Sequence, residues 1–168
     1  MTLILTPFNE TQQIAEEFFA LTDKNRSYLR EWLPWLDFVQ KVSDTHKFLQ
    51  DNCQSDKFGT TLNFFICDNN KIIGTIGLRD ITPQSALVGY WLDKSYNGQG
   101  ITTNALQQLI TVVQEKNLTK QIILRCNPKN IGSKKIALKC GFIYQETLKN
   151  AENLYGVDFD LEIYIRSI

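Results

Sequence analysis

The chain has 168 residues, 43% of them hydrophobic, and its 18 basic side chains balance 18 acidic ones. This length supports a full hydrophobic core, and the zero net charge argues against non-specific nucleic-acid binding. No run of about 18 uncharged apolar residues is present to cross a bilayer, and residues 1–7 lack the basic and apolar regions of a secretory signal. We expect one domain over residues 1–168, located in the cytoplasm, with no nucleic-acid or membrane partner.

The cysteines are scattered along the chain, without a Cys-x-x-Cys pair and without a nearby histidine. They are Cys53, Cys67, Cys126 and Cys140. This spacing indicates neither a zinc site nor a disulfide framework, so we expect no metal and buried, reduced thiols.

Basic residues are concentrated in residues 94–149, whereas the flanking segments are net acidic. The segment contains Lys94, Lys116, Lys120, Arg125, Lys129, Lys134, Lys135, Lys139 and Lys149, against Glu115 and Glu146. This distribution suits an anionic ligand. Alternatively, these side chains form the solvated faces of two helices.

The first part of the chain predicts mainly helices. We expect a strand over residues 2–6 and helices over residues 9–23, 27–32 and 43–52. Asn9 and Ser43 are candidate N-caps for the first and third helices, and Pro34 limits the second. Phe48 is expected on the inner side of the third helix.

From residue 62 the pattern changes to strands. We expect strands over residues 62–67, 71–78, 86–92 and 121–125, helices over residues 101–113 and 132–139, and a C-terminal hairpin. The turn residues 68–70 join the first two strands into a hairpin, and Gly141 is a candidate left-handed helix cap. In the last strand the apolar side chains from Phe159 to Ile165 alternate with a polar face that runs from Asp158 to Tyr164 and is expected to be wet. The order of elements predicts an α+β fold around one largely antiparallel sheet.

One junction in this order has the features of an anion site. The strand that ends at residue 92 leads into Asn97-Gly98-Gln99-Gly100, after which a helix begins. Glycines allow close approach of the backbone to a ligand, and the first amides of a helix have no partner within the helix. Strand, glycine turn and helix also occur together as an ordinary structural joint, which is the alternative interpretation.

The chain resembles the GCN5-related N-acetyltransferases over nearly its whole length. The resemblance is carried by the order of elements, by Tyr90-Trp91-Leu92-Asp93 followed by residues 97–101, and by Asn130-Ile131-Gly132-Ser133 leading to residues 137–142. It implies a mixed, largely antiparallel central sheet that is flanked by helices and splayed at the third sheet strand, at a bulge. It also implies acetyl-CoA as cosubstrate, without a metal.

The resemblance assigns the coenzyme contacts residue by residue. They are Trp91, Leu92, Asn97, Gly98, Gln99, Gly100, Ile101, Thr102, Thr103 and Asn130. Main-chain groups of Trp91 and Leu92 would pair with the pantetheine arm, and the amides of residues 98–103 would hold the pyrophosphate. Asn97 and Thr102 depart from the family pattern at the two ends of the loop. Because the loop works through main-chain amides, these changes are expected to alter affinity more than to abolish binding.

Within that superfamily, residues 32–35 and 148–152 resemble the branch that acetylates the N-termini of ribosomal proteins. This resemblance implies Ser133 as the hydroxyl that protonates the departing thiolate and Glu152 as the general base. It also implies that Trp32 and Trp35 line an acceptor groove. As alternatives, Ser133 is a helix-capping residue, Glu152 is an exposed residue in the link between two strands, and the tryptophans are a lid over the sheet.

The pKa of the acceptor amine favours an N-terminus. An α-amino group has a pKa of about 7.7–8.0 and lysine about 10.4, a difference of about 3.4 kcal/mol in deprotonation. A single carboxylate is therefore better suited to an N-terminal amine. We expect direct acetyl transfer to a protein N-terminus, such as that of a ribosomal protein, by an enzyme that is a candidate homodimer. The alternatives are acetylation of a polyamine or an antibiotic, and a non-catalytic acyl-CoA-binding module.

Overall fold

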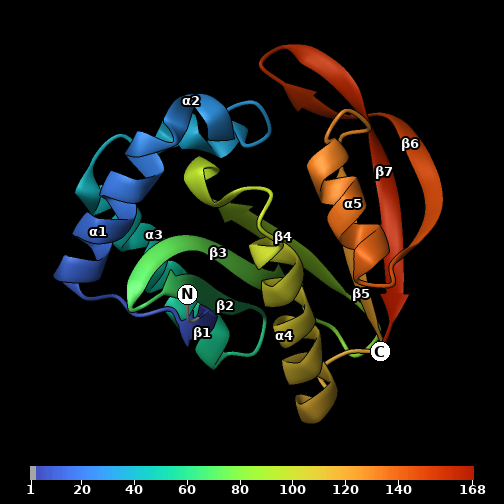
Figure 1. Ribbon diagram of the computed structural model, residues 1–168, viewed down its shortest axis with the longest axis horizontal. Coiled ribbons are helices and arrows are strands. Elements are labelled where there is room, and N and C mark those ends of the chain that lie inside the picture. The colour runs from blue at the N-terminus through green and yellow to red at the C-terminus, as the bar shows by residue number, and fades with distance from the viewer. Residues whose placement is uncertain (1–2) are drawn as a thin grey trace.

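The computed structural model describes residues 3–168 and contains one seven-stranded sheet with helices on both faces (Figure 1). The strands are β1 (Leu3–Pro7), β2 (Leu62–Asp68), β3 (Lys71–Arg79), β4 (Ala86–Leu92), β5 (Gln121–Cys126), β6 (Ile143–Leu154) and β7 (Val157–Ser167). The helices are α1 (Gln12–Lys24), α2 (Arg26–Leu29), α3 (Val42–Lys57), α4 (Ile101–Lys116) and α5 (Ile131–Lys139), with 3₁₀ helices η1 (Pro34–Phe38) and η2 (Lys94–Tyr96). Thr2, in the first predicted strand, lies outside the described residues.

The strands follow the order β1-β2-β3-β4-β5-β7-β6. Every neighbouring pair is antiparallel except β4 and β5, which are parallel. The predicted α+β class and the largely antiparallel sheet are therefore confirmed. Asn69 and Asn70 have positive φ angles of 47° and 69°, which form the tight turn of the β2–β3 hairpin.

Alternating side chains give the sheet two apolar faces, as the period of a strand requires. On β2, Phe64 and Ile66 belong to the core cluster beneath α4 and α5. Phe65 and Cys67 point to the opposite face and join the cluster formed with α1, α2, η1 and α3. Both faces are thus buried, which explains why the central strands read as nearly continuous apolar runs.

The sheet opens between its two parallel strands. β4 pairs with β5 only from Ala86 to Val88, opposite Ile122 to Leu124. Beyond that point β4 continues along β3 to Leu92, and β5 continues along β7, so the strands diverge (Figure 1). The predicted splay is confirmed, but the expected bulge is wrong, because the β3–β4 register runs without a shift.

The helix starts differ from the sequence prediction. The N-cap of α1 is Thr11, whose hydroxyl accepts a hydrogen bond from the Ile14 amide, so the assignment of Asn9 is wrong. The third helix begins before Ser43, at Val42, because the Asp44 carboxylate accepts from the Lys41 amide at 3.1 Å. A carboxylate at the third helical position caps the helix from inside its first turn.

The face of β7 that includes Glu162 and Tyr164 is less exposed to solvent than predicted. Tyr164 is 4% exposed, and Glu162 forms an ion pair with Lys134 of α5 at 2.9 Å. Burial raises the pKa of Glu162, but hydrogen bonds from Tyr164 and Lys134 outweigh it and bring the pKa below its ordinary value. The prediction of a wet face is wrong here because α5 packs over this part of the strand.

Among residues 3–168 no helix is both long and apolar enough to cross a membrane.

Candidate active site

A cavity of about 890 Å³ runs through the opening between β4 and β5. It is bounded by the start of α4 and α5 on one side, and by α1, η1 and α3 on the other. Residues near the tip of the β6–β7 hairpin complete its wall. This volume lies within the range of pockets that hold cofactors and small ligands.

The glycine loop forms one end of the cavity. Gly98 and Gly100 have φ angles of +79° and +76°, which disfavour residues with a Cβ atom. A Cβ added at either position would meet nothing within 4 Å, so both glycines are required by backbone conformation and not by crowding. α4 begins at Ile101, which lines the cavity together with Thr102 and Thr103, and the first amides of a helix have no partner within it.

The segment before this loop is tied to α1 and α2. The Asp93 carboxylate is buried and forms an ion pair of 2.7 Å with Lys24. The Lys94 amide donates to the Asn25 side-chain oxygen at 2.9 Å. At the loop itself, the Asn97 side-chain amide donates to the Tyr28 hydroxyl at 2.9 Å. Asn97, which departs from the family pattern, therefore holds the loop against α2.

The start of α5 forms a second polar group. The Asn130 side chain caps this helix by accepting from the Ser133 amide at 3.1 Å. Both residues line the cavity, as does Tyr90 of β4. The capping role therefore belongs to Asn130, which leaves the Ser133 hydroxyl available to the cavity.

Aromatic residues line the opposite part of the cavity. Trp32 and Trp35 both contribute to the wall, and the Trp35 ring is parallel to that of Phe48, with 3° between their planes and 6.5 Å between their centroids. Phe48 is 41% exposed, so the prediction that it lies on the inner side of its helix holds only in part.

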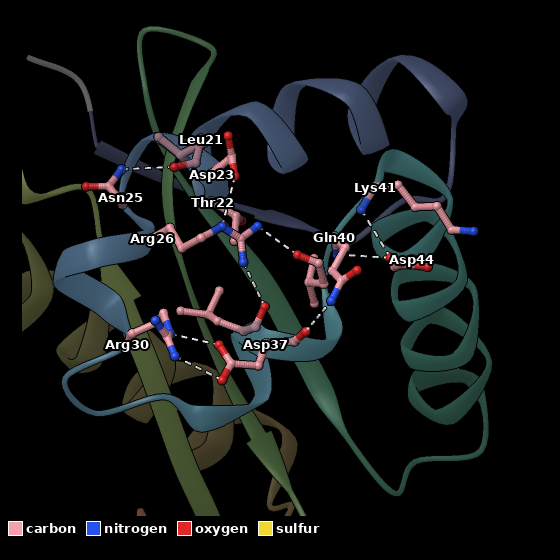
Figure 2. Close-up of polar contacts among 12 residues, drawn as sticks. Leu21, Thr22, Asp23, Asn25, Arg26, Arg30, Asp37, Gln40, Lys41 and Asp44 are labelled. Carbon is pink, nitrogen blue, oxygen red and sulfur yellow. Dashed lines mark hydrogen bonds and ion pairs between the residues drawn. The ribbon is translucent and has the colours of Figure 1, made fainter. Parts of the chain in front are cut away.

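Two arginines hold the segment that carries these tryptophans (Figure 2). Arg26 donates to the main-chain oxygens of Leu36 at 2.8 Å and Val39 at 2.7 Å. Arg30 pairs with Asp37 through its Nε atom at 2.7 Å and through a second hydrogen bond of 3.0 Å. Pro34 begins a 3₁₀ turn, whereas the preceding helix already ends at Leu29, so the predicted extension of that helix to residue 32 is wrong.

Glu152 lies inside β6, opposite Phe159, and is exposed while also lining the cavity. Its assignment to a link between strands is wrong. The β6–β7 register shifts between Leu148 and Glu152, where Asn150 has a positive φ of 48°. This irregularity sets which face of the strand each following side chain occupies.

Basic side chains outnumber acidic ones along the cavity wall. Arg79, Arg125, Lys135 and Lys139 line it, with Glu152 as the acidic residue among the described lining residues. Only part of the basic segment faces the cavity, since Lys134 pairs with Glu162 and Lys149 with Asp160. Among residues 3–168 no group of three or more His, Cys, Asp or Glu side chains is placed to hold a metal ion.

The structure brings nearly all of the predicted site residues together. Trp32, Trp35, Trp91, Leu92, Asn97, Gly98, Gly100, Ile101, Thr102, Thr103, Asn130, Ser133 and Glu152 line the same cavity. Gln99 does not; its side chain donates to the Ser95 main-chain oxygen at 3.3 Å and it borders a neighbouring hollow. The sequence analysis did not predict a role for Asn25 or Tyr28. Neither residue belongs to a recognisable motif, and their partners, Lys94 and Asn97, lie 69 residues further along the chain.

Residues 2–143 match the family model described as an acetyltransferase (GNAT) domain. The chain belongs to the GNAT acetyltransferase family. In this acetyltransferase the part that matches the family model, residues 2–143, ends where β6 begins. β7, which lies beyond this part, pairs with β5 inside it.

Relatives of this acetyltransferase include the ribosomal-protein-serine acetyltransferase of Escherichia coli strain K12, which is 36% identical over 152 residues, covering 89% of this chain and 85% of that protein. A solved ribosomal L7/L12 α-N-acetyltransferase in complex with coenzyme A has a TM-score of 0.95 and 29% identity, covering 100% of this chain and 95% of that chain. A microcin C7 self-immunity acetyltransferase in complex with acetyl-CoA and AMP has a TM-score of 0.91 and 31% identity, with coverage of 99% and 92%.

Proposed function

We propose that this acetyltransferase transfers the acetyl group of acetyl-CoA directly to the α-amine of a protein N-terminus, such as that of a ribosomal protein. The observation that carries the proposal is the continuous cavity, which joins the glycine loop at one end to Glu152 and the tryptophans at the other. Its basic lining suits the phosphates of the coenzyme. The relatives bound to acetyl-CoA or coenzyme A support this choice.

In the proposed complex, the amides of residues 98–103 bind the pyrophosphate at the start of α4. β4 has no β5 partner beyond Val88, so the main-chain edge that it turns away from β3 is open to the pantetheine arm near Leu92, whereas the Trp91 carbonyl lies against Gly74 of β3. The same edge offers an amide to the oxyanion that forms when the amine attacks the thioester. Asn97, Gln99 and Asn130 hold the loop and the helix start around the coenzyme.

The proton balance requires two side chains. Glu152 takes a proton from the attacking nitrogen and passes it to solvent. When the C–S bond breaks, the electron pair stays on sulfur, which takes the Ser133 hydroxyl proton, and Ser133 regains a proton from solvent. The products are the acetylated amine and free coenzyme A.

The acceptor proposal rests on amine chemistry and on the relatives that act on ribosomal proteins. An α-amine needs less help from a base than lysine does, and the cavity offers a single carboxylate, Glu152, among its described lining residues. Trp32 and Trp35 would border the first residues of the peptide.

The test is thiol release from acetyl-CoA with peptides that start with Ser, Ala or Met, with lysine peptides and with spermidine. We expect turnover on one class of N-terminal peptide, lowered about 100-fold by Glu152→Gln. The matched control is Glu146→Gln, which alters an exposed residue of the same strand outside the cavity lining. Coenzyme binding without thiol release from any amine would overturn the proposal and favour the acyl-CoA-binding module. Parallel double-reciprocal plots would overturn direct transfer.

A second candidate acceptor is a small α-amine that carries a nucleotide. The relative with bound AMP suggests it, and the exposed, parallel rings of Trp35 and Phe48 offer stacking surfaces for a flat base. Base stacking on aromatic side chains contributes about 1–3 kcal/mol. Under this alternative Trp35→Ala raises the KM for an amino acid joined to an adenosine nucleotide about tenfold, with little change for peptides. Equal effects on both acceptors would exclude it.

We also infer that residues 1–168 act as one domain, because β7, beyond the family segment, pairs with β5 inside it. A cytoplasmic location fits an enzyme that takes ribosomal proteins as acceptors. A homodimer and the absence of nucleic-acid binding remain predictions, which sedimentation equilibrium and a binding assay with RNA would test.

A further inference from the structure

Two arginines of the cavity wall, Arg79 and Arg125, lie on one face of the sheet. Arg79 of β3 is paired in register with Leu87 of β4, which is paired with Ile123 of β5. Paired residues share a face of the sheet, and so do residues two apart on one strand, so Arg79 and Arg125 project from the same face. Trp91, four residues after Leu87, shares this face and belongs to the core cluster formed with α1, η1 and α3. The two arginines are therefore on the side of the sheet where the tryptophan segment lies.

The other basic residues of the cavity wall lie on the opposite face. Lys135 and Lys139 belong to α5, which packs with α4 on that side of the sheet (Figure 1). The proposed pyrophosphate site is at the start of α4, so the coenzyme phosphates have these cations on their own side. The coenzyme therefore does not explain why Arg79 and Arg125 line the cavity.

Both arginines are available to a negatively charged group. The Arg125 side chain is exposed and makes no hydrogen bond or ion pair with residues 3–168. Arg79 pairs with Asp80 at 3.3 Å, with both side chains more than half exposed. An exposed ion pair contributes little to stability, so another carboxylate can compete with Asp80. A guanidinium binds a carboxylate through two parallel hydrogen bonds, which makes a carboxylate the fitting ligand.

Gly89 leaves the floor of the cavity bare beside Arg125. Each of these residues comes directly after the stretch in which β4 pairs with β5. Gly89 is exposed, has no positive φ, and a Cβ atom added there would meet nothing within 4 Å. Its partner Gly77 differs, because a Cβ there would lie 2.5 Å from the Asn63 side chain. Neither conformation nor crowding explains Gly89, and a glycine inside a strand often marks the close approach of another chain.

Glu152, the proposed base, projects from the same face at a distance that a short peptide spans. Glu152 is paired with Phe159 of β7, and Arg125 is paired with Ile163 of β7. These two positions of β7 are four residues apart, which corresponds to about 13 Å at a rise of about 3.3 Å per residue. An extended peptide has a similar rise. A peptide whose α-amine lies at Glu152 therefore brings its third to fifth residues to Arg125.

We propose that Arg79 and Arg125 bind an acidic side chain at the third to fifth residue of the acceptor, whose main chain passes over Gly89. The inference rests on the proposed function and deepens it, since it gives the acceptor an acidic residue close behind its N-terminus. Arg125 makes the principal contact, and Arg79 exchanges Asp80 for the acceptor carboxylate. The arginines hold the acceptor and do not touch the reacting amine.

The test measures thiol release from acetyl-CoA with short peptides that begin with the N-terminal residue preferred by the wild type. Each peptide is otherwise neutral and carries one Asp at a position from 2 to 6, and its matched peptide carries Asn there. The preference is the ratio of the two kcat/KM values. We expect a preference of about tenfold within positions 3 to 5, and of less than about twofold at position 2.

Variants of the arginines show where the preference arises. Arg125→Gln is expected to reduce it to about twofold, and Arg125→Glu to reverse it in favour of Lys at the same position. Arg79→Gln acts in the same direction with a smaller effect. Lys71→Gln is the matched control, since Lys71 is an exposed residue of β3 outside the cavity lining, and it keeps the full preference. The coenzyme Kd by calorimetry is expected to stay within about twofold in every variant.

Gly89→Ala tests the path of the acceptor main chain. The position has room for a methyl group and no positive φ, so the Tm is expected to stay unchanged or to rise. The KM for the acidic peptide is expected to rise about fivefold, because the methyl group occupies the space of the acceptor. A lowered Tm, or an unchanged KM, would overturn the passage of the acceptor over Gly89.

Three results would overturn the arginine site while leaving turnover in place. They are equal kcat/KM values for the Asp and Asn peptides, a preference that survives Arg125→Gln, and a loss of coenzyme affinity in the arginine variants. If Arg125→Gln impairs only an amino acid joined to an adenosine nucleotide, the arginines bind a phosphate, which also overturns the proposal. If the wild type releases no thiol with any amine, the proposed function itself fails, and this inference fails with it.

Discussion

Asp93 shows how one buried charge shapes the coenzyme loop. Asp93 is 1% exposed, and its carboxylate accepts hydrogen bonds from the Lys24 side chain and from the Ser95 amide. Burial raises the pKa of Asp93, but the hydrogen bonds from Lys24 and Ser95 outweigh it, so that the pKa lies below its ordinary value. The carboxylate is therefore ionised at neutral pH and fixes the turn that precedes the glycine loop.

Asp93→Asn is expected to lower the free energy of unfolding by about 1–3 kcal/mol at pH 7, because a charged hydrogen-bond acceptor is lost. Since the folded-state pKa is depressed, the stabilisation is present above the unfolded-state value of about 3.9 and is lost as the pH falls through the folded-state pKa. Urea titrations at pH 7 and in steps below pH 4 measure this. A difference between variant and wild type that does not shrink in acid would contradict the assignment.

Lys24→Met serves as the partner variant for Asp93. It keeps an unbranched side chain one heavy atom shorter and leaves the buried carboxylate without its cation. We expect it to be destabilising by itself and non-additive with Asp93→Asn, because the two changes remove the same interaction.

At the scale of single elements, the loop between η2 and α4 depends on backbone conformation. Gly100 is the N-cap of α4, with φ +76° and ψ 4° in the left-handed region. Asn130 at the start of α5 works differently, by accepting from Ser133 through its side chain. No side chain therefore caps the first amides of α4, which suits a bulky anion.

Gly100→Ala is expected to cost about 1–2 kcal/mol of stability and to weaken coenzyme binding about tenfold, because alanine resists the left-handed conformation. Gly59→Ala is the matched control: Gly59 has φ +73°, also with open space around it, and is not part of the cavity wall. Thermal unfolding and calorimetry with coenzyme A measure the two effects. Equal coenzyme affinity in the two variants would show that the loop conformation does not matter for binding.

Across the whole molecule, the glycine loop and the cavity wall that carries the tryptophans are linked by contacts between segments 69 residues apart. These contacts join Lys24 to Asp93, Asn25 to Lys94 and Tyr28 to Asn97. Arg26 then connects α2 to the segment that carries Trp35. An ordered glycine loop therefore stabilises the segment that carries Trp35 through these contacts.

Binding of coenzyme A is expected to slow amide hydrogen exchange in residues 26–38, although these residues lie beyond the loop that is proposed to bind it. Tyr28→Phe is expected to reduce this added protection, because it removes the acceptor of the Asn97 hydrogen bond. Tyr144→Phe is the control. Hydrogen exchange followed by mass spectrometry tests it, and the same gain in protection in both variants would mean that the link is not made through Tyr28.

Features that depend on short stretches of chain could be predicted before the fold was known. The strand over residues 62–67, the asparagine turn before β3 and the glycines before α4 each follow from local sequence. Nearly all of the residues that the family resemblance predicts for the site line one cavity. The helix starts were less well predicted, because Thr11 and Asp44 compete as caps with Asn9 and Ser43 over one or two positions.

The pairing of polar groups, in contrast, depends on how distant elements pack. Burial of Asp93, the ion pair of Lys134 with Glu162 and the unpartnered hydroxyl of Tyr90 arise where distant elements pack together. Lys134 and Lys135 are adjacent in the sequence and have the same side chain. Lys134 nevertheless forms an ion pair with Glu162, whereas Lys135 lines the cavity. Solvent access and electrostatic partners are properties of the packed interior, and local sequence does not contain them.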